Sequence, residues 1–260
     1  MADYYYADPT GNITVLAALP AGAASLPELA EGYMRLEPSA EQVGFLSGGS
    51  DGADISLTMA GGEFCGNATL SAAAVYCMQN SFITGERTVL VGASGAEAPV
   101  PVQVTALSDA CFEGTVSMPC PTGIEPIQLF YDGIPYSFVK VEFPGITHLV
   151  FCGRMEKSAA ESAAPVWCKA LNADALGILF LDEQTDTLTP LVYVESAGTL
   201  FWESSCASGT TAAGACLRWK NNGASVTKAF REPAGTLKIH ADSDGQLFLT
   251  GRVAITHKYF

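Results

Sequence analysis

Short runs of alternating hydrophobic and polar residues fill most of the chain, a pattern typical of strands with one buried face. The clearest case is residues 54–59, where polar residues separate Ile55, Leu57 and Met59. Comparable short runs predict further strands at 4–7, 13–19, 42–46, 87–91, 100–106, 112–118, 136–143, 147–152, 175–181, 188–194, 199–202, 225–230, 236–240, 246–249 and 252–257. We therefore expect a protein built mainly of short strands.

Four segments carry a helical pattern instead. Ser25 and Glu28 form a capping box, which predicts a helix from there to about residue 36. A second helix is expected at 158–171, where Pro165 should kink or split it. The remaining two, at 66–79 and 206–220, are rich in alanine and apolar on nearly all sides. A helix of that kind must be surrounded by other elements, here sheet.

Each of the two apolar helices begins beside a cysteine in a similar motif. The motifs read Gly61-Gly62-Glu63-Phe64-Cys65-Gly66-Asn67-Ala68-Thr69-Leu70 and Trp202-Glu203-Ser204-Ser205-Cys206-Ala207-Ser208-Gly209-Thr210-Thr211. The first amides of a helix have no internal partner, and the helix dipole favours negative charge there. A thiol at that position ionises more readily, and a carboxylate binds to the same amides. Two such cysteines facing one bound acid would suit removal of a proton from one face of a carbon and its return to the other.

The two halves follow a similar plan, which gives the expected architecture. We predict an α+β fold of two pseudo-symmetric lobes, each a curled, mostly antiparallel sheet around a central helix, with the active site in the cleft between them. Residues 118–123 have no regular pattern and are the expected boundary. The N-terminal lobe, 1–118 joined by the C-terminal strand 250–260, carries Cys65. The C-terminal lobe, 119–249, carries Cys206.

Charge and composition narrow the class of protein. The net charge of −14 argues against nucleic acid and anionic membranes as partners, and a hydrophobic fraction of 48% is ample for a packed core. Residues 176–181 are the longest clearly apolar run, which is too short to cross a bilayer, and the N-terminus lacks the features of a signal peptide. We therefore expect a cytoplasmic protein whose cysteines are mostly reduced. The cysteines and the three histidines lack metal-site spacings, so no metal is expected.

Four stretches resemble the diaminopimelate epimerase-like family of cofactor-independent amino-acid racemases and epimerases. They are 9–16 (Pro-Thr-Gly-Asn-Ile-Thr-Val-Leu), 41–45 (Glu-Gln-Val-Gly-Phe) and the cysteine motifs at 63–69 and 202–210. The similarity spans nearly the whole chain and is greater to the histidine racemases of staphylopine-type metallophore biosynthesis. It implies an isomerase that inverts the α-carbon of an amino acid, L-histidine to D-histidine, without pyridoxal phosphate or another cofactor. The expected binding partner is a small-molecule amino acid substrate, and the resemblance leaves open whether the protein forms a homodimer.

The resemblance also implies roles for individual residues. Cys65 and Cys206 would be the two acid/base groups, one thiolate and one thiol, and Asn12 and Asn67 would bind the amino and carboxylate groups. The remaining substrate-binding positions would be Gly66, Glu203, Ala207 and Ser208, with Glu41 reaching the substrate's side chain. The family's arginines beside a distal carboxylate are missing from 68–70 and 199–203. Their absence disfavours diaminopimelate, whereas Phe201 and Trp202 beside Glu41 or Glu203 would suit an imidazole.

Simpler interpretations stay open for each of these residues. Cys65 and Cys206 could be core thiols, the commonest fate of a free cysteine. Asn12 and Asn67 could be left-handed turn residues, Glu41 and Glu203 solvated charges, and Trp202 a packing residue. A hydrolase or transferase using one cysteine with a histidine is a second class of function, and a non-catalytic binding module is a third. Another amino acid is the alternative substrate within the family.

Overall fold

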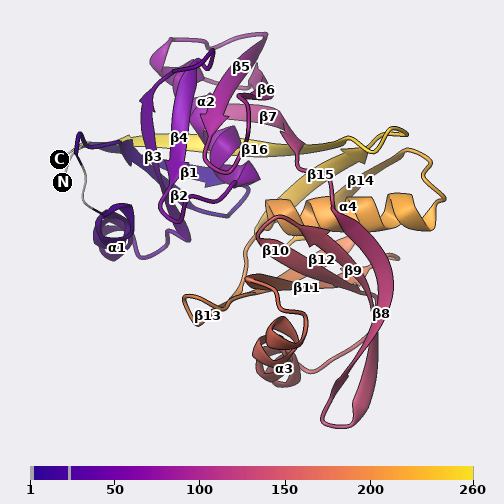
Figure 1. Ribbon diagram of the computed structural model, residues 1–260. Coiled ribbons are helices and arrows are strands. Elements are labelled where there is room, and N and C mark those ends of the chain that lie inside the picture. The colour runs from indigo at the N-terminus through magenta and orange to yellow at the C-terminus, as the bar shows by residue number, and fades with distance from the viewer. Residues whose placement is uncertain (1–2, 23–24, 260) are drawn as a thin grey trace. The chain divides into compact units, whose positions relative to one another are not determined.

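The computed structural model describes residues 3–22 and 25–259. Over those residues the chain forms sixteen strands and four helices (Figure 1). Contacts divide it into two compact units. Unit 1 comprises Met1–Ser117 with Leu249–Phe260, and unit 2 comprises Met118–Phe248. Each unit contributes one of the two cysteine-bearing helices.

Unit 1 is a sheet that closes on itself around helix α2 (Gly66–Gln79). Its strands pair in the order β1-β2-β3-β4-β5-β6-β7-β16, and β16 also pairs with β1. They are β1 (Tyr4–Pro9), β2 (Thr14–Ala18), β3 (Gln42–Gly48), β4 (Ile55–Met59), β5 (Glu86–Ala93), β6 (Val100–Ala106), β7 (Cys111–Met118) and β16 (Leu247–Lys258). Helix α1 (Leu26–Leu36) packs against β3, while α2 contacts β1, β2, β4, β5 and β6. The closed sheet explains why α2 is apolar on nearly all sides.

Unit 2 is a sheet with a helix on each face. Strands pair in the order β15-β14-β12-β11-β10-β9-β8, and β13 is added to β12. They are β8 (Gly123–Tyr131), β9 (Ile134–Phe143), β10 (Ile146–Phe151), β11 (Ala175–Asp182), β12 (Thr187–Val194), β13 (Thr199–Trp202), β14 (Val226–Glu232) and β15 (Gly235–Ala241). Helix α3 (Lys157–Ala170) contacts β11 and β12, and α4 (Ala207–Lys220) contacts β9, β10, β11, β14 and β15 (Figure 1).

Alternation along β11 separates the surroundings of the two helices. Leu176 and Ile178 belong to the buried cluster beneath α3. Leu179 lies on the other face, where a Cβ added to Gly209 of α4 would come within 2.8 Å of its Cδ2 atom. Neighbouring side chains of a strand point to opposite faces. The sheet therefore separates the hydrophobic cluster beneath α3 from the N-terminal end of α4, where Cys206 lies.

Most of the predicted elements are confirmed, including all four helices. Strand β8 was not expected, because Glu125 and Pro126 interrupt its hydrophobic pattern and much of it is exposed. Asp132 and Gly133, with φ of 50° and 75°, make the two-residue turn that joins it to β9. The prediction of separate strands at 246–249 and 252–257 is wrong, since both belong to β16.

Pro165 was expected to kink or split its helix. The prediction of a split is wrong. Helix α3 runs continuously over Lys157–Ala170 with Pro165 inside it. Proline removes one amide donor, but its fixed φ is compatible with a helix. The helix is held from one side, because Ala160, Ala163, Ala164 and Trp167 are all buried against the sheet.

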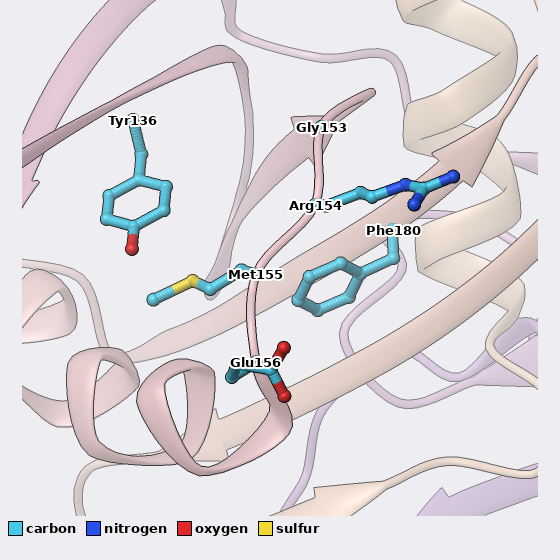
Figure 2. Close-up of a pocket in the computed structure, with 6 residues that line it drawn as sticks. All are labelled: Tyr136, Gly153, Arg154, Met155, Glu156 and Phe180. Atoms are coloured by element: carbon cyan, nitrogen blue, oxygen red, sulfur yellow. The ribbon is translucent and has the colours of Figure 1, made fainter.

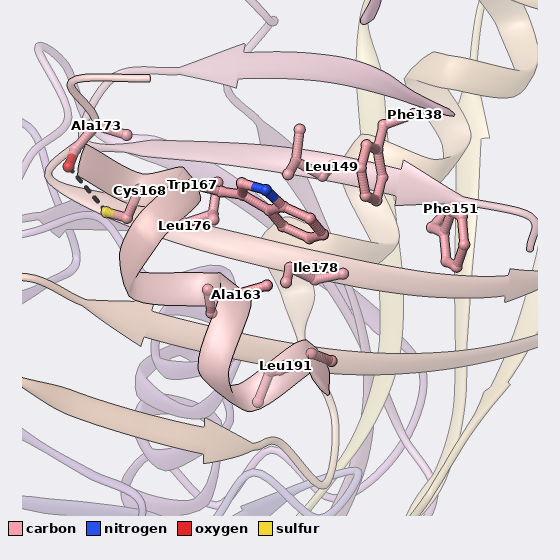
Figure 3. Packing of buried hydrophobic residues seen from close by; sticks show 12 residues of the cluster. Phe138, Leu149, Phe151, Ala163, Trp167, Cys168, Ala173, Leu176, Ile178 and Leu191 are labelled. Atoms are coloured by element: carbon pink, nitrogen blue, oxygen red, sulfur yellow. Dashed lines mark hydrogen bonds between the residues drawn. The ribbon is translucent and has the colours of Figure 1, made fainter. Parts of the chain in front are cut away.

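Trp167 is the largest buried side chain of unit 2, so its replacement is a test of the packing of α3 against the sheet. It makes an edge contact with Phe138, which lies beside it in Figure 3. It also makes an edge contact with Tyr136, and its indole N–H donates to the Phe130 carbonyl at 3.0 Å. We expect Trp167→Ala to lower the free energy of unfolding by about 3–5 kcal/mol, because it leaves a cavity and an unpaired carbonyl. Urea denaturation measures this change.

The neighbouring Val166, 53% exposed, is the matched control. Val166→Ala should change the free energy of unfolding by about 0.5 kcal/mol or less. Equal losses at the two positions would contradict the assignment of Trp167 as the centre of the cluster.

Candidate active site

Both cysteines lie at helix N-termini with nearly the same local geometry. Cys65 is the N-cap of α2, with φ and ψ of −130° and 114°, and its Sγ atom accepts from the Ala68 amide at 3.5 Å. Cys206 is the N-cap of α4, with φ and ψ of −129° and 105°, and its Sγ atom accepts from the Gly209 amide at 3.3 Å. The prediction that each cysteine begins a buried helix is confirmed.

A glutamine that the sequence did not single out connects the predicted residues of unit 1. The Cys65 thiol donates to Gln42 Oε1 at 3.2 Å, and Gln42 Nε2 donates to Asn12 Oδ1 at 2.7 Å. Asn67 Nδ2 donates to the same Asn12 oxygen at 3.1 Å. Cys65, Asn12 and Asn67 therefore belong to one hydrogen-bonded group with Gln42 at its centre.

Asn12 and Asn67 are buried polar residues rather than turn residues. Both are almost fully buried, and neither has the positive φ of a left-handed turn, which Thr10 and Gly11 adopt instead. The alternative reading of these asparagines as turn residues is therefore wrong. Asn67 Oδ1 has no hydrogen-bond partner among the residues that the structure describes. A buried acceptor without a partner is costly, so this oxygen is suited to a ligand that brings an N–H donor.

Glu41 lies at the outer end of the same group. Its Oε2 atom accepts from Asn12 Nδ2 at 2.5 Å. The residue is exposed, as the simpler interpretation expected, and its carboxylate is also hydrogen-bonded to a predicted binding residue.

In unit 2 a buried glutamate holds the start of α4. Glu232 Oε2 accepts from the Cys206 backbone amide at 2.7 Å, and Glu232 Oε1 accepts from the Thr210 hydroxyl. Ser208 places its hydroxyl 3.5 Å from Cys206 Sγ. Ala207 is the first residue of the helix. The sequence analysis assigned no role to Glu232 or Thr210, although Glu232 occupies a buried position in the alternating pattern of β14.

The protonated forms of Cys206 and Glu232 are favoured in this environment. Burial raises the pKa of the Cys206 thiol well above its usual value, and Glu203 and Glu232 raise it further. Burial also raises the pKa of Glu232 to about 8, against the opposing hydrogen bonds from Thr210 and the Cys206 amide. A negative charge on one of these groups at the start of α4 thus disfavours ionisation of the others.

Trp202 packs against α3 rather than standing beside the predicted glutamates. Its indole N–H donates to Glu161 at 2.7 Å, and its ring lies 5.6 Å from that of Phe180. The packing interpretation of Trp202 is therefore supported. Phe201, on the same strand, is 59% exposed.

A surface cavity of about 500 Å³ opens on this same side of the unit 2 sheet (Figure 2). It is lined by Tyr136, Gly153, Arg154, Met155, Glu156 and Phe180. Phe180 follows Leu179, whose side chain contacts α4, so the sheet separates the cavity from Cys206. None of the predicted site residues lines it.

Within 3–22 and 25–259, no group of three or more His, Cys, Asp or Glu residues is arranged to hold a metal ion. In the same ranges no helix has the length and hydrophobicity to cross a membrane.

Glu232 makes stability depend on pH in a defined direction. The folded protein holds this proton more tightly than the unfolded chain, where the usual glutamate value of 4.5 applies. The contribution is therefore complete below that value and is lost as pH rises to about 8. Glutamine keeps an acceptor for the Cys206 amide and a donor toward Thr210. We expect Glu232→Gln to gain stability relative to the parent protein as pH rises from about 5 to 8.

Chemical unfolding curves at several pH values measure the effect. Glu97→Gln, at an exposed glutamate, is the control and should follow the parent protein at every pH. Parallel curves for the parent and Glu232→Gln would contradict the burial of an uncharged Glu232.

Comparison with known proteins places the chain in a family. The family model described as "Histidine racemase CntK N-terminal domain" matches residues 1–257. A histidine racemase from Fusobacterium nucleatum subsp. nucleatum is 31% identical over 262 residues, covering 97% of this chain and 94% of that protein. A histidine racemase from Staphylococcus aureus is 26% identical over 247 residues, covering 92% and 88%.

A solved structure supports the same fold. A hydroxyproline epimerase from Agrobacterium vitis matches with a TM-score of 0.69 at 12% identity, over 100% of this chain and 92% of that one. At that identity the likeness concerns the fold, which is of the α+β racemase and epimerase class. The match to residues 1–257, together with the near-complete coverage of the curated relatives, shows that the chain belongs to the histidine racemase family.

Proposed function

We propose that this protein interconverts L- and D-histidine by a two-base mechanism that uses Cys65 and Cys206 and no pyridoxal phosphate. The observation that carries the proposal is the repeated geometry of the two cysteines, each the N-cap of a buried helix in a member of this family. One thiolate removes the α-proton while the other thiol delivers a proton to the opposite face. The proposed active site is the cleft between the two lobes, where both helix N-termini would meet one substrate.

Binding of the amino-acid head group follows from the chemistry of the helix termini. Backbone amides at Gly66, Asn67, Ala207 and Ser208 are the natural partners of the substrate carboxylate. The unpaired Asn67 Oδ1 is the natural acceptor for the substrate ammonium group. The same amides stabilise the charge that develops on the carboxylate when the α-proton leaves.

Recognition of the side chain is assigned to Glu41 and Glu203. Carboxylates suit an imidazole, which donates N–H bonds in both its neutral and its charged form. Glu203 also raises the pKa of Cys206. A positively charged group beside Glu203 offsets that effect, so substrate binding itself would favour the thiolate of Cys206.

The size of the chemical problem explains why two thiols alone are insufficient. An amino-acid α-proton is a very weak acid, and general acid–base catalysis supplies about 10²–10⁴-fold. The remainder comes from holding the substrate between the thiols and from the helix amides at the carboxylate. Cysteine suits inversion because one residue waits protonated while the other is ionised.

The biological setting is proposed from the family resemblance. D-Histidine would enter metallophore biosynthesis in the cytoplasm, with no nucleic-acid or membrane partner. Neighbouring genes for an aminobutyrate-transferring synthase and an opine-type dehydrogenase would support this role.

The decisive measurement is proton NMR of L-histidine in D₂O with reduced protein and no pyridoxal phosphate. We expect the α-proton signal to disappear as D-histidine forms. Cys65→Ser and Cys206→Ser should each lose at least about 10²-fold of the rate, because serine is a far weaker acid and base than cysteine. Cys120→Ser, at an exposed cysteine, is the control and should keep full activity.

Alanine, methionine and diaminopimelate in parallel test the substrate. Exchange on one of these alone would keep the mechanism and change the substrate. Dependence on only one thiol would contradict the two-base mechanism and favour single-cysteine chemistry.

A further inference from the structure

We infer that Glu41, Asn12 and Gln42 form a directional chain that holds Cys65 as a protonated thiol in the ligand-free protein. The chain runs through unit 1 and rests on contacts of 3.2 Å or less. The inference rests on the proposed function, which makes Cys65 one of the two acid/base residues. It adds Gln42 as a positioning residue and gives Glu41 a role besides contact with substrate.

The direction of the chain begins at Glu41. An ionised carboxylate only accepts hydrogen bonds, so Asn12 must turn its Nδ2 group toward Glu41. Asn12 Oδ1 then faces inward and requires donors. Two amide groups supply them, Nε2 of Gln42 and Nδ2 of Asn67. The orientation of Asn12 thus fixes the orientation of Gln42.

Thr14 fixes Gln42 a second time. Its hydroxyl donates to the Asn12 backbone carbonyl at 3.0 Å, which uses its only hydrogen. The Thr14 oxygen can therefore only accept from Gln42, and Gln42 Nε2 donates to it at 2.8 Å. Reversing Gln42 would place its carbonyl oxygen against two acceptors.

Gln42 Oε1 is consequently the atom that faces Cys65. A carbonyl oxygen carries no hydrogen, so it pairs with the thiol and repels the thiolate. The contact with the Ala68 amide favours the thiolate but is longer, at 3.5 Å. Cys206 Sγ pairs instead with the carboxyl of Glu203, the Gly209 amide and the hydroxyl of Ser208. A neutral amide oxygen therefore faces the thiol of Cys65, whereas a carboxyl oxygen faces that of Cys206.

Charged groups of unit 1 near Cys65 also favour its thiol form. Their effect must be distinguished experimentally from that of the hydrogen-bonded chain. Glu41 lies immediately before β3, and Glu63 precedes Cys65 by two residues. Both carry negative charge, which also disfavours a thiolate. Salt screens the effect of exposed charges but leaves the direction of a short hydrogen bond unchanged.

The test is the pH dependence of iodoacetamide labelling at Cys65 in the full-length protein, measured by peptide mass spectrometry. Gln42→Met removes the carbonyl at nearly constant size. We expect Cys65 labelling near pH 7 to become about five- to tenfold faster, with the midpoint of its pH profile lowered, as loss of one hydrogen bond to the thiol predicts. Gln42→Glu keeps an acceptor and adds charge, so labelling should become slower.

Opposite changes in the two variants distinguish this role from unfolding, which would accelerate labelling in both. Glu41→Gln keeps an acceptor for Asn12 Nδ2, and Thr14 still fixes Gln42, so any change in labelling should come from the lost charge and vanish in about 1 M salt. Glu63→Gln is the matched control for charge, and any effect it has should vanish in that salt. Unchanged labelling in Gln42→Met, or acceleration in both Gln42 variants, would overturn the inference.

Labelling does not depend on catalysis, so the two proposals fail separately. Absence of racemisation with the expected labelling pattern would remove the proposed function and keep the thiol assignment. Racemisation with unchanged labelling would do the reverse.

Discussion

Each of the two buried helices begins with a hydrogen bond that a cysteine makes poorly. An N-cap side chain must accept from the helix amides, and sulfur is a weaker acceptor than the oxygens of Ser, Thr, Asp or Asn that normally take this position. Both helices nevertheless begin at cysteine. The stability that the cap does not supply comes from packing, because most residues of each helix are buried against sheet. Each thiol is thus held at the start of a helix that packing stabilises independently of the cap.

The two cysteines differ in the groups that surround them. In unit 1 the partner of the cysteine side chain is an amide oxygen, whose direction is set by a chain of neutral groups ending at Glu41. In unit 2 the buried acid Glu232 accepts from the backbone amide of Cys206, and a second carboxyl, that of Glu203, pairs with the cysteine side chain. The helix termini are nearly superimposable in φ and ψ, so the asymmetry arises from the strands around them and not from the caps.

The sequence predicted what is local and missed what depends on pairing. Helix α2 and the position of Cys65 follow from composition over a few residues, and the structure places both as predicted. Gln42 became recognisable only through the parallel pairing of β2 with β3, which sets it opposite Thr14 and close to Asn12. Nothing in the spacing of 12, 42 and 65 gives that register. The position of Trp202 depended likewise on the face of the sheet to which β13 turns its indole.

Glu232 is a second residue whose role depends on its buried contacts and not on the local sequence. A buried carboxyl costs free energy unless its oxygens are paired, and here both have partners, Thr210 and the Cys206 amide. Remaining uncharged, it caps the first turn of α4 without placing a full negative charge beside Cys206. If Glu232 ionises, it and Glu203 both oppose formation of the Cys206 thiolate. Protonation of Glu232 therefore links the stability of the α4 terminus to the reactivity of the thiol that begins it.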